Sequence, residues 1–116
     1  MIINKLTYEP GKVFPECAIK TEDSVKVADI VWISPTRYQR LKAEFVYPLA
    51  AEICVEMLSS SNTLDEMRRK IALYLQAGAE EVWTCNEHGQ LQFYNQNGEL
   101  EHSLLITAFP QKITVE

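Results

Sequence analysis

The segment VKVADIVWI, residues Val25 to Ile33, places one acid inside a run of β-branched and aromatic residues. This composition is typical of a β-strand. Val13 to Lys20 has a similar composition, and the polar turn TEDS, residues 21–24, separates the two segments. We therefore expect them to pair as an antiparallel hairpin. The acid, Asp29, needs a partner, an exposed position or a metal ion, because an ionised carboxylate is costly to bury.

Downstream of the hairpin, Ser34 and Pro35 are typical of a helix start and predict a short basic helix over about residues 36–44. The segment AEICVEML, residues 51–58, predicts a strand. Because successive side chains of a strand point to opposite faces, Glu52 and Glu56 should share a face. Two neighbouring strands could thus bring the carboxylates of Asp29 and Glu56 together.

The clearest helix is predicted over about residues 64–77. Thr63 and Glu66 form a capping-box pattern, and Gly78 occupies the position that follows a helix end. Strands are then predicted at residues 81–85, 91–94 and 102–107, with turns at 86–89 and 97–98. The order β-β-α-β-α-β-β-β, ending in a β-meander, predicts an α+β sheet protein.

The length, composition and charge of the chain limit the classes of function that it can have. The chain has 116 residues, enough for one domain over residues 1–116, and it has no apolar run of membrane-spanning length. No cleavable hydrophobic segment opens the sequence, so we expect a cytoplasmic protein. The net charge of −5 argues against non-specific coating of nucleic acid, but it leaves a carboxylate-bearing nuclease open. Cys17, Cys54 and Cys85 are predicted to be buried free thiols, and His88 and His102 receive no role.

Metal-dependent hydrolysis of a phosphodiester needs carboxylates to hold the cation and a nearby positive charge. Asp29, Glu56 and Lys70 could supply these groups. Each has a simpler interpretation when taken alone: a strand acid commonly lies on a solvated face, and Lys70 follows Glu66 at the spacing of an ordinary helical ion pair. Likewise, residues 68–70 could contact phosphate or form the solvent-exposed face of the helix.

Taken in order, the segments VADIVWIS (residues 27–34), AEICVEMLSSSNT (51–63) and DEMRRK (65–70), followed by Tyr74, Gly78 and Trp83, resemble the Uma-type restriction endonucleases. The family pattern is PD followed by apolar residues, then (P)E-apolar-x-VEVxSPS, then D-x(4)-K-x(3)-Y-x(3)-G and a strand with E-x-W. The resemblance covers nearly the whole chain. It implies a restriction-endonuclease-like mixed β-sheet and a Mg²⁺- or Mn²⁺-dependent nuclease of the PD-(D/E)XK type that acts on DNA.

The resemblance assigns Asp29 as the PD aspartate and Glu56 as the acid of the (D/E)XK half. Leu58 stands where the lysine of that motif is expected, and Lys70 matches the lysine that family members supply from the next helix. Glu16 matches a recurring acid of the preceding strand and is a candidate additional metal ligand. Glu52 is a weaker candidate of the same kind.

Two departures concern backbone stiffness, since Ala28 and Ser60 replace prolines of the family pattern. A third concerns length: family members generally carry a longer N-terminal part with a helix. The resemblance therefore implies a short member in which a dimer partner, another protein or another helix covers one sheet face. Three hypotheses follow: a metal-dependent endonuclease, an inactive nuclease-fold interaction module that is expected to form a homodimer, and a plain α+β domain in which Lys70 pairs with Glu66.

Overall fold

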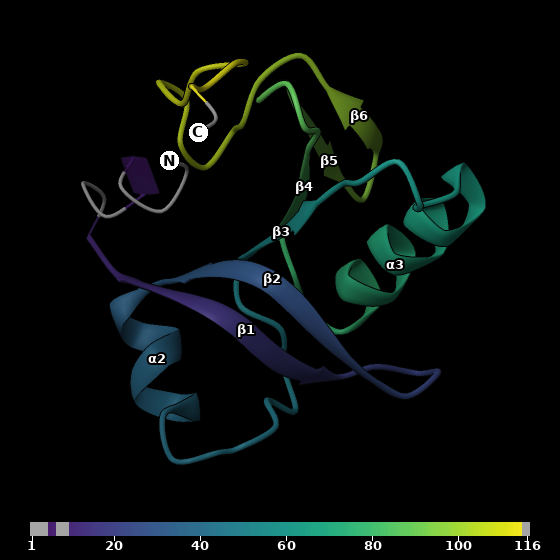
Figure 1. Ribbon diagram of the computed structural model, residues 1–116. Coiled ribbons are helices and arrows are strands. Elements are labelled where there is room, and N and C mark those ends of the chain that lie inside the picture. The colour runs from purple at the N-terminus through teal and green to yellow at the C-terminus, as the bar shows by residue number, and fades with distance from the viewer. Residues whose placement is uncertain (1–4, 7–9, 115–116) are drawn as a thin grey trace.

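The computed structural model describes residues 5–6 and 10–114, and its named strands form one six-stranded sheet (Figure 1). The strands lie side by side in chain order; β3 and β4 are parallel and all other neighbours are antiparallel. The α+β class and the mixed sheet are therefore confirmed. The elements are β1 (Lys12–Lys20), β2 (Val25–Ile33), α2 (Pro35–Leu41), β3 (Ile53–Met57), α3 (Leu64–Gln76), β4 (Glu81–Cys85), β5 (Leu91–Asn95) and β6 (Gly98–Leu100).

Helix α3 connects the two parallel strands, which cannot be joined by a tight turn. It starts as the sequence predicts: Thr63 Oγ1 accepts a hydrogen bond from the Glu66 N–H at 3.1 Å. The helix ends at Gln76, and Gly78 follows with a φ of 114°, a conformation that favours glycine. The predicted cap and stop signals are both confirmed, and the helix is one residue shorter than expected.

Helix α2 is capped by Ser34, whose hydroxyl accepts from the Arg37 N–H at 3.1 Å. It ends at Leu41, three residues before the predicted end at residue 44. The chain then crosses the outer edge of β1, where Tyr47 exchanges backbone hydrogen bonds with Ala18 and Lys20, each 2.9 Å long. Because an open strand edge is a template for unwanted pairing, this crossing protects part of β1.

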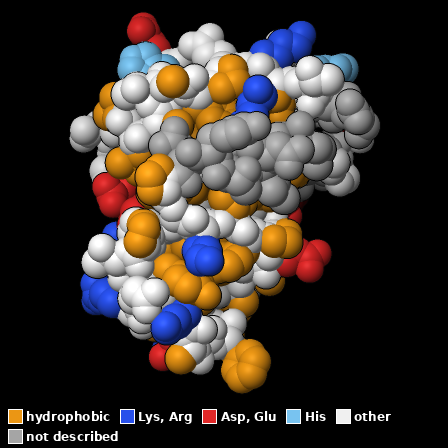
Figure 2. All heavy atoms as spheres, turned by 90° about the vertical axis from the view of Figure 1, so that its left-hand side faces the viewer, with side chains coloured by type: hydrophobic (Ala, Val, Ile, Leu, Met, Phe, Trp, Pro, Cys, Tyr) orange, Lys and Arg blue, Asp and Glu red, His pale blue; other side chains and the backbone are white. Residues whose placement is uncertain are grey.

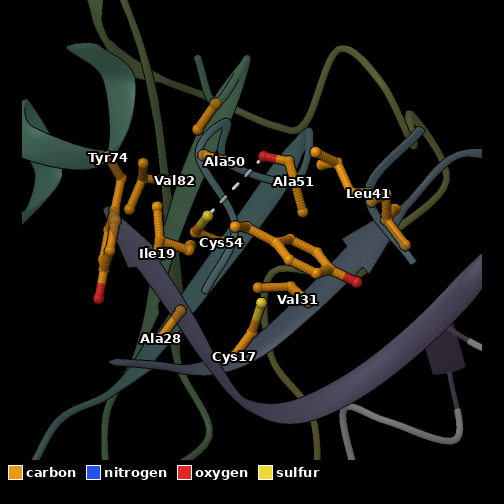
Figure 3. Close-up of a cluster of buried hydrophobic side chains, with 13 residues drawn as sticks. Cys17, Ile19, Ala28, Val31, Leu41, Ala50, Ala51, Cys54, Tyr74 and Val82 are labelled. Atoms are coloured by element: carbon orange, nitrogen blue, oxygen red, sulfur yellow. Dashed lines mark hydrogen bonds between the residues drawn. The ribbon is translucent and has the colours of Figure 1, made fainter. Parts of the chain in front are cut away.

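Two hydrophobic clusters lie on opposite faces of the sheet. Both helices pack on the first, which we call cluster 1, through residues such as Leu41 and Tyr74 (Figure 3). The second, cluster 2, surrounds Trp83 and is completed by Leu6 and by Ile106 and Phe109 of the C-terminal segment. The three cysteines are buried free thiols, as predicted. No helix in the described part of the chain is long and apolar enough to cross a membrane.

The prediction of a strand at residues 102–107 is wrong. This segment forms no strand; instead it is held by Glu81, a carboxylate that is only 2% exposed. Glu81 accepts from the Ser103 hydroxyl at 2.7 Å and from the backbone N–H groups of Leu104 and Leu105 at 2.8 and 3.0 Å. The N–H groups of Leu104 and Leu105 are therefore satisfied by one buried side chain rather than by a neighbouring strand.

Candidate active site

Asp29 and Glu56 meet where strands β2 and β3 separate. The last backbone pair recorded between these strands is Ile30 with Val55, and the next step of the same register brings Asp29 opposite Glu56. At this point, hydrogen bonds from backbone to side chain replace those between the two backbones. The Asp29 N–H donates to Glu56 Oε2 at 3.0 Å, and the Met57 N–H donates to Asp29 Oδ2 at 2.7 Å. Each carboxylate is thus fixed by the backbone of the opposite strand.

A local distortion of β1 and β2 accompanies this arrangement. In β2, Ala28 packs in cluster 1 but Ile30 packs in cluster 2, so the alternation of side chains changes phase at Asp29. Strand β1 distorts at Glu16, whose φ of 53° lies in the left-handed region. Glu16 is the residue that faces Asp29 in the β1–β2 register, between the pairs Pro15–Ile30 and Cys17–Ala28. Such distortions commonly re-aim a side chain beside an active site.

Lys70 of helix α3 contacts Glu56 of this pair. Its ammonium group lies 2.5 Å from Glu56 Oε1, whereas the described residues show no ion pair between Lys70 and Glu66. The plain interpretation of Lys70 as the partner of Glu66 is therefore wrong. The three consecutive cations of this helix diverge: Lys70 contacts Glu56, Arg69 lies 3.5 Å from Asp23 of the hairpin turn, and Arg68 lines a cavity beside β4 and β5.

The Glu56 carboxylate is almost completely buried, with 3% of its side chain exposed. Burial is the largest influence on its pKa and raises it, and the negative charge of Asp29 acts in the same direction. The hydrogen bonds from Lys70 and from the Asp29 N–H oppose this rise. A buried acid held between a like charge and a cation is typical of a functional site, although structural ion pairs share the pattern.

Tyr74 lies one helical turn after Lys70 and is wholly buried in cluster 1, beside Ile19 and Val82 (Figure 3). Within the described residues its hydroxyl group has no hydrogen-bond partner. Burial raises the pKa of this hydroxyl, and the charge of Glu56 raises it further. Tyr74 therefore stays neutral and packs against the same region of the sheet that carries the acids.

Within the described residues, the other acids singled out in the sequence make no hydrogen bond to this pair. The exposed Glu16 lines a separate surface cavity with Tyr38 and Phe45, and Glu52 lies at the opposite end of β3. Across residues 5–6 and 10–114, no three His, Cys, Asp or Glu side chains gather as a metal-binding group. The structure thus brings together Asp29, Glu56 and Lys70, but it does not preassemble three carboxylates.

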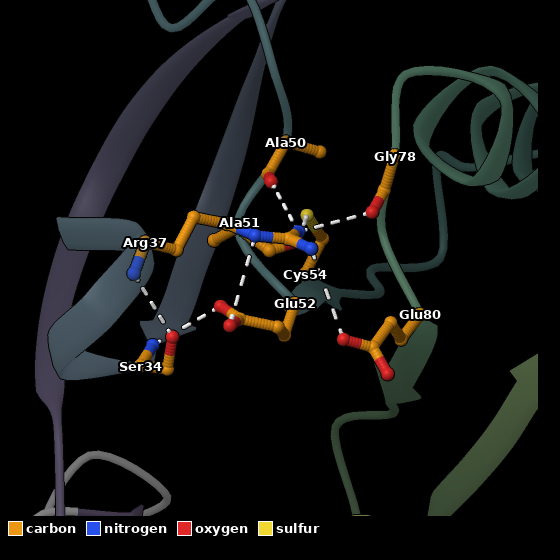
Figure 4. Close-up of polar contacts among 8 residues, drawn as sticks. All are labelled: Ser34, Arg37, Ala50, Ala51, Glu52, Cys54, Gly78 and Glu80. Atoms are coloured by element: carbon orange, nitrogen blue, oxygen red, sulfur yellow. Dashed lines mark hydrogen bonds and ion pairs between the residues drawn. The ribbon is translucent and has the colours of Figure 1, made fainter. Parts of the chain in front are cut away.

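Glu52 has a structural partner that the sequence did not reveal. The Arg37 guanidinium lies 3.6 Å from Glu52 Oε2 and donates to the carbonyl oxygens of Ala50 and Gly78 at 2.8 and 3.0 Å (Figure 4). Glu52 Oε1 accepts from the Ser34 N–H at 3.0 Å. Arg37 thereby joins α2 to the start of β3 and to the end of α3. No local signal distinguishes it from the exposed Arg40, because the carbonyl oxygens to which it donates are 13 and 41 residues away.

The Asp29–Glu56 pair fits a hard divalent cation. Both groups are carboxylates, the ligand type that Mg²⁺ and Mn²⁺ prefer, and Mg²⁺ is commonly held by one or two carboxylates with water and substrate phosphate. Asp29 Oδ2 accepts from Met57, while Asp29 Oδ1 has no hydrogen bond within the described residues. That oxygen is free to bind a ligand. The pair also lies at the carboxyl end of β3, the edge at which α/β units commonly place their sites.

The family comparison matches residues 3–116 to the Uma2 family, whose description is "Putative restriction endonuclease". The chain belongs to the Uma2 family. This confirms the resemblance drawn from the sequence segments around Asp29, Glu56 and Lys70. No curated protein matches the chain.

Among solved structures, the Uma2 chain is similar to the crystal structure of a "putative nuclease" of the family DUF820 from Anabaena variabilis. The TM-score is 0.69 at 19% sequence identity, so the likeness shows a shared fold. The aligned region covers 85% of this chain and 59% of the other chain. The chain therefore spans about three fifths of the length of that nuclease.

Proposed function

We propose that this protein is a metal-dependent DNA endonuclease whose active site consists of Asp29, Glu56 and Lys70. The observation that carries the proposal is the convergence of these three residues from β2, β3 and α3, joined by direct contacts through Glu56. Membership of the Uma2 family supports the reaction class, since the family's description is "Putative restriction endonuclease". The fold alone would not, because one fold hosts many activities.

In this proposal Asp29 and Glu56 would hold Mg²⁺ or Mn²⁺ at the carboxyl end of β3. The bound cation would act as a Lewis acid on the scissile phosphate and lower the pKa of a bound water. Lys70 keeps its ammonium beside Glu56, where it can orient the attacking water or stabilise negative charge on the phosphate. Glu16 faces Asp29 in the strand register, so its side chain would have to turn from its surface cavity to serve as an additional ligand.

One observation favours a second candidate, an interaction module that forms a homodimer. Phe45 is 100% exposed at the crossing that covers β1, and Phe14 and Tyr38 pack nearby with ring centroids 5.7 Å apart. Figure 2 shows hydrophobic side chains gathered around Lys and Arg side chains on this side of the molecule. A second copy that covered this surface would remove Phe45 from water. The dimer is compatible with the nuclease as well as with an inactive remnant.

Cleavage of supercoiled plasmid in Mg²⁺ or Mn²⁺ tests the nuclease. We expect the wild type to nick the plasmid, EDTA to abolish nicking, and Asp29→Asn to reduce the rate by at least about a hundredfold. Asp23→Asn is the matched control, because Asp23 is an exposed acid of the same hairpin. A folded wild type that leaves the plasmid intact, or equal rates for both variants, would overturn the proposal in favour of the interaction module.

A further inference from the structure

A cavity of about 440 Å³ opens between helix α3 and the outer strands of the sheet. Its volume lies within the range of small-molecule sites. Helix α3 contributes Met67, Arg68 and Ile71 to its wall, and the sheet contributes Thr84, Gln92 and Tyr94. Neither the candidate active site nor the hydrophobic clusters explain the polar groups that face it.

Asp29, Glu56 and Lys70 do not line the cavity, but the strand register places Glu56 beside Thr84, a residue of its wall. Glu56 of β3 faces Thr84 of β4 in the strand register, and Thr84 faces Gln92 of β5. Registered partners point to the same face of a sheet. Because neighbouring strands lie about 4.8 Å apart, Gln92 is about 10 Å from Glu56 across the sheet. A strand of nucleic acid with its phosphate at Glu56 would therefore reach the cavity with an adjacent nucleotide.

The charges in the cavity favour a polar, neutral and flat ligand. Arg68 and Glu99 bring one charge of each sign, so a free anion would meet repulsion from Glu99 as well as attraction from Arg68. Tyr94 Oη donates to Gln92 Oε1 at 3.3 Å, and Gln92 Nε2 donates to Glu99 Oε2 at 3.4 Å. These bonds are long and lie at the surface, so the edge of a nucleobase could replace them.

The cavity wall also offers side chains that can contact the two faces of a nucleobase. Tyr94 is half-buried and offers an aromatic ring, and Met67 and Ile71 offer apolar surface from the opposite wall. Stacking of a base on an aromatic side chain is the usual way in which proteins hold unpaired nucleotides. A base inside a duplex cannot enter such a cavity, because its faces are covered by its neighbours.

We infer that this cavity is a subsite for one unstacked nucleotide next to the scissile phosphate, with Tyr94 as its stacking platform and Gln92 as its edge-reading group. The substrate class is then DNA with an unpaired nucleotide beside the cut, such as a single strand. This inference rests on the proposed nuclease function, because Glu56 defines where the phosphate lies.

Fluorescence anisotropy in EDTA measures binding without cleavage. The probes are a labelled single-stranded oligonucleotide of mixed sequence and the duplex of the same sequence. We expect the wild type to bind the single strand more tightly, Tyr94→Leu to weaken that binding at least about fivefold, and Tyr94→Phe to retain it. Tyr38→Leu is the matched control: it removes another half-buried tyrosine, which packs near β1 and outside the cavity, and should leave binding unchanged.

Equal single-strand affinity for the wild type and a folded Tyr94→Leu variant, or a wild type that prefers the duplex, would overturn the subsite. If the protein nicks plasmid but gives either of these results, the subsite fails and the nuclease stands. If it binds single strands through Tyr94 but never nicks in Mg²⁺ or Mn²⁺, the nuclease fails while nucleotide binding in the cavity stands.

Discussion

At Glu56, burial disfavours the ionised carboxylate that the proposed metal site requires. Its carboxylate is 3% exposed, next to Asp29, and its pKa is raised chiefly by burial. A purely structural residue at this position would be better neutral, because a buried charge costs free energy even when it is paired. Functional residues commonly carry such a cost, so Glu56 should limit the stability of the fold.

The pH dependence of stability tests this view through Glu56→Gln. A carboxyl group whose pKa is raised in the folded state favours folding most below its unfolded pKa, here 4.5, and this contribution is lost as pH rises through the raised pKa. We therefore expect the wild type to lose unfolding free energy relative to Glu56→Gln over that interval. Chemical denaturation of both proteins at a series of pH values measures the difference.

Glu44→Gln is the control for this series, since Glu44 is exposed and has no ion pair within the described residues. Its difference from the wild type should vary less with pH. A Glu56→Gln difference that stays constant from acid to neutral pH, or that moves the other way, would show that Glu56 is not held at a cost.

Tyr74 gives a second prediction for a single residue. Its hydroxyl is buried without a partner in the described part of the chain, which costs free energy. Tyr74→Phe keeps the ring in cluster 1 and removes only this oxygen, so we expect the free energy of unfolding to rise by about 1 kcal/mol. Urea denaturation measures the change. A loss of stability would instead indicate that the hydroxyl binds an ordered water beside Glu56 and Asp29.

At the scale of elements, Arg37 holds α2, β3 and α3 in their relative positions. Its side chain is 18% exposed and makes two hydrogen bonds to carbonyl oxygens in addition to its ion pairs with Glu52 and Glu80. Arg37→Met keeps most of the aliphatic stem but leaves Glu52 buried without its cation. We expect a loss of about 2–4 kcal/mol in unfolding free energy, measured by chemical denaturation.

Arg40→Met is the matched control on the same helix, because Arg40 is exposed. It should change stability by less than about 0.5 kcal/mol. Similar losses for both variants would mean that helix charge, rather than the specific contacts of Arg37, stabilises this region.

The helices and strands also show which structural features local sequence patterns can predict. The cap at Thr63 and the stop at Gly78 are local signals, and they bounded α3 to within one residue. The prediction of a strand at residues 102–107 was wrong because an apolar run does not show which group accepts the hydrogen bonds of its backbone N–H groups. There Glu81 accepts the N–H groups of Leu104 and Leu105, a contact across more than 20 residues that no local pattern contains.

At the scale of the whole molecule, the strand patterns of the sequence singled out two of the three residues that the structure brings together. Asp29 and Glu56 stood out as acids within apolar strands, whereas the helix pattern left Lys70 open between a site cation and a partner of Glu66 until the resemblance to the Uma-type family favoured the first. The parallel pairing of β3 with β4 was not foreseen, and it explains the geometry: α3 must cross back over the sheet, which carries Lys70 to Glu56. Glu16, the further candidate ligand, faces Asp29 in the β1–β2 register and lines a separate surface cavity.

The proposed nuclease requires Asp29 and Lys70 to act as one catalytic unit through Glu56. Groups that act as a unit lose their effects together rather than additively. The decisive measurement is the rate of plasmid nicking in Mg²⁺ by the wild type, Asp29→Asn, Lys70→Ala and the double variant, each checked for folding. We expect each single change to abolish most of the activity and the double variant to be no slower than the slower single variant. Full activity in either single variant, or losses that multiply in the double variant, would contradict it.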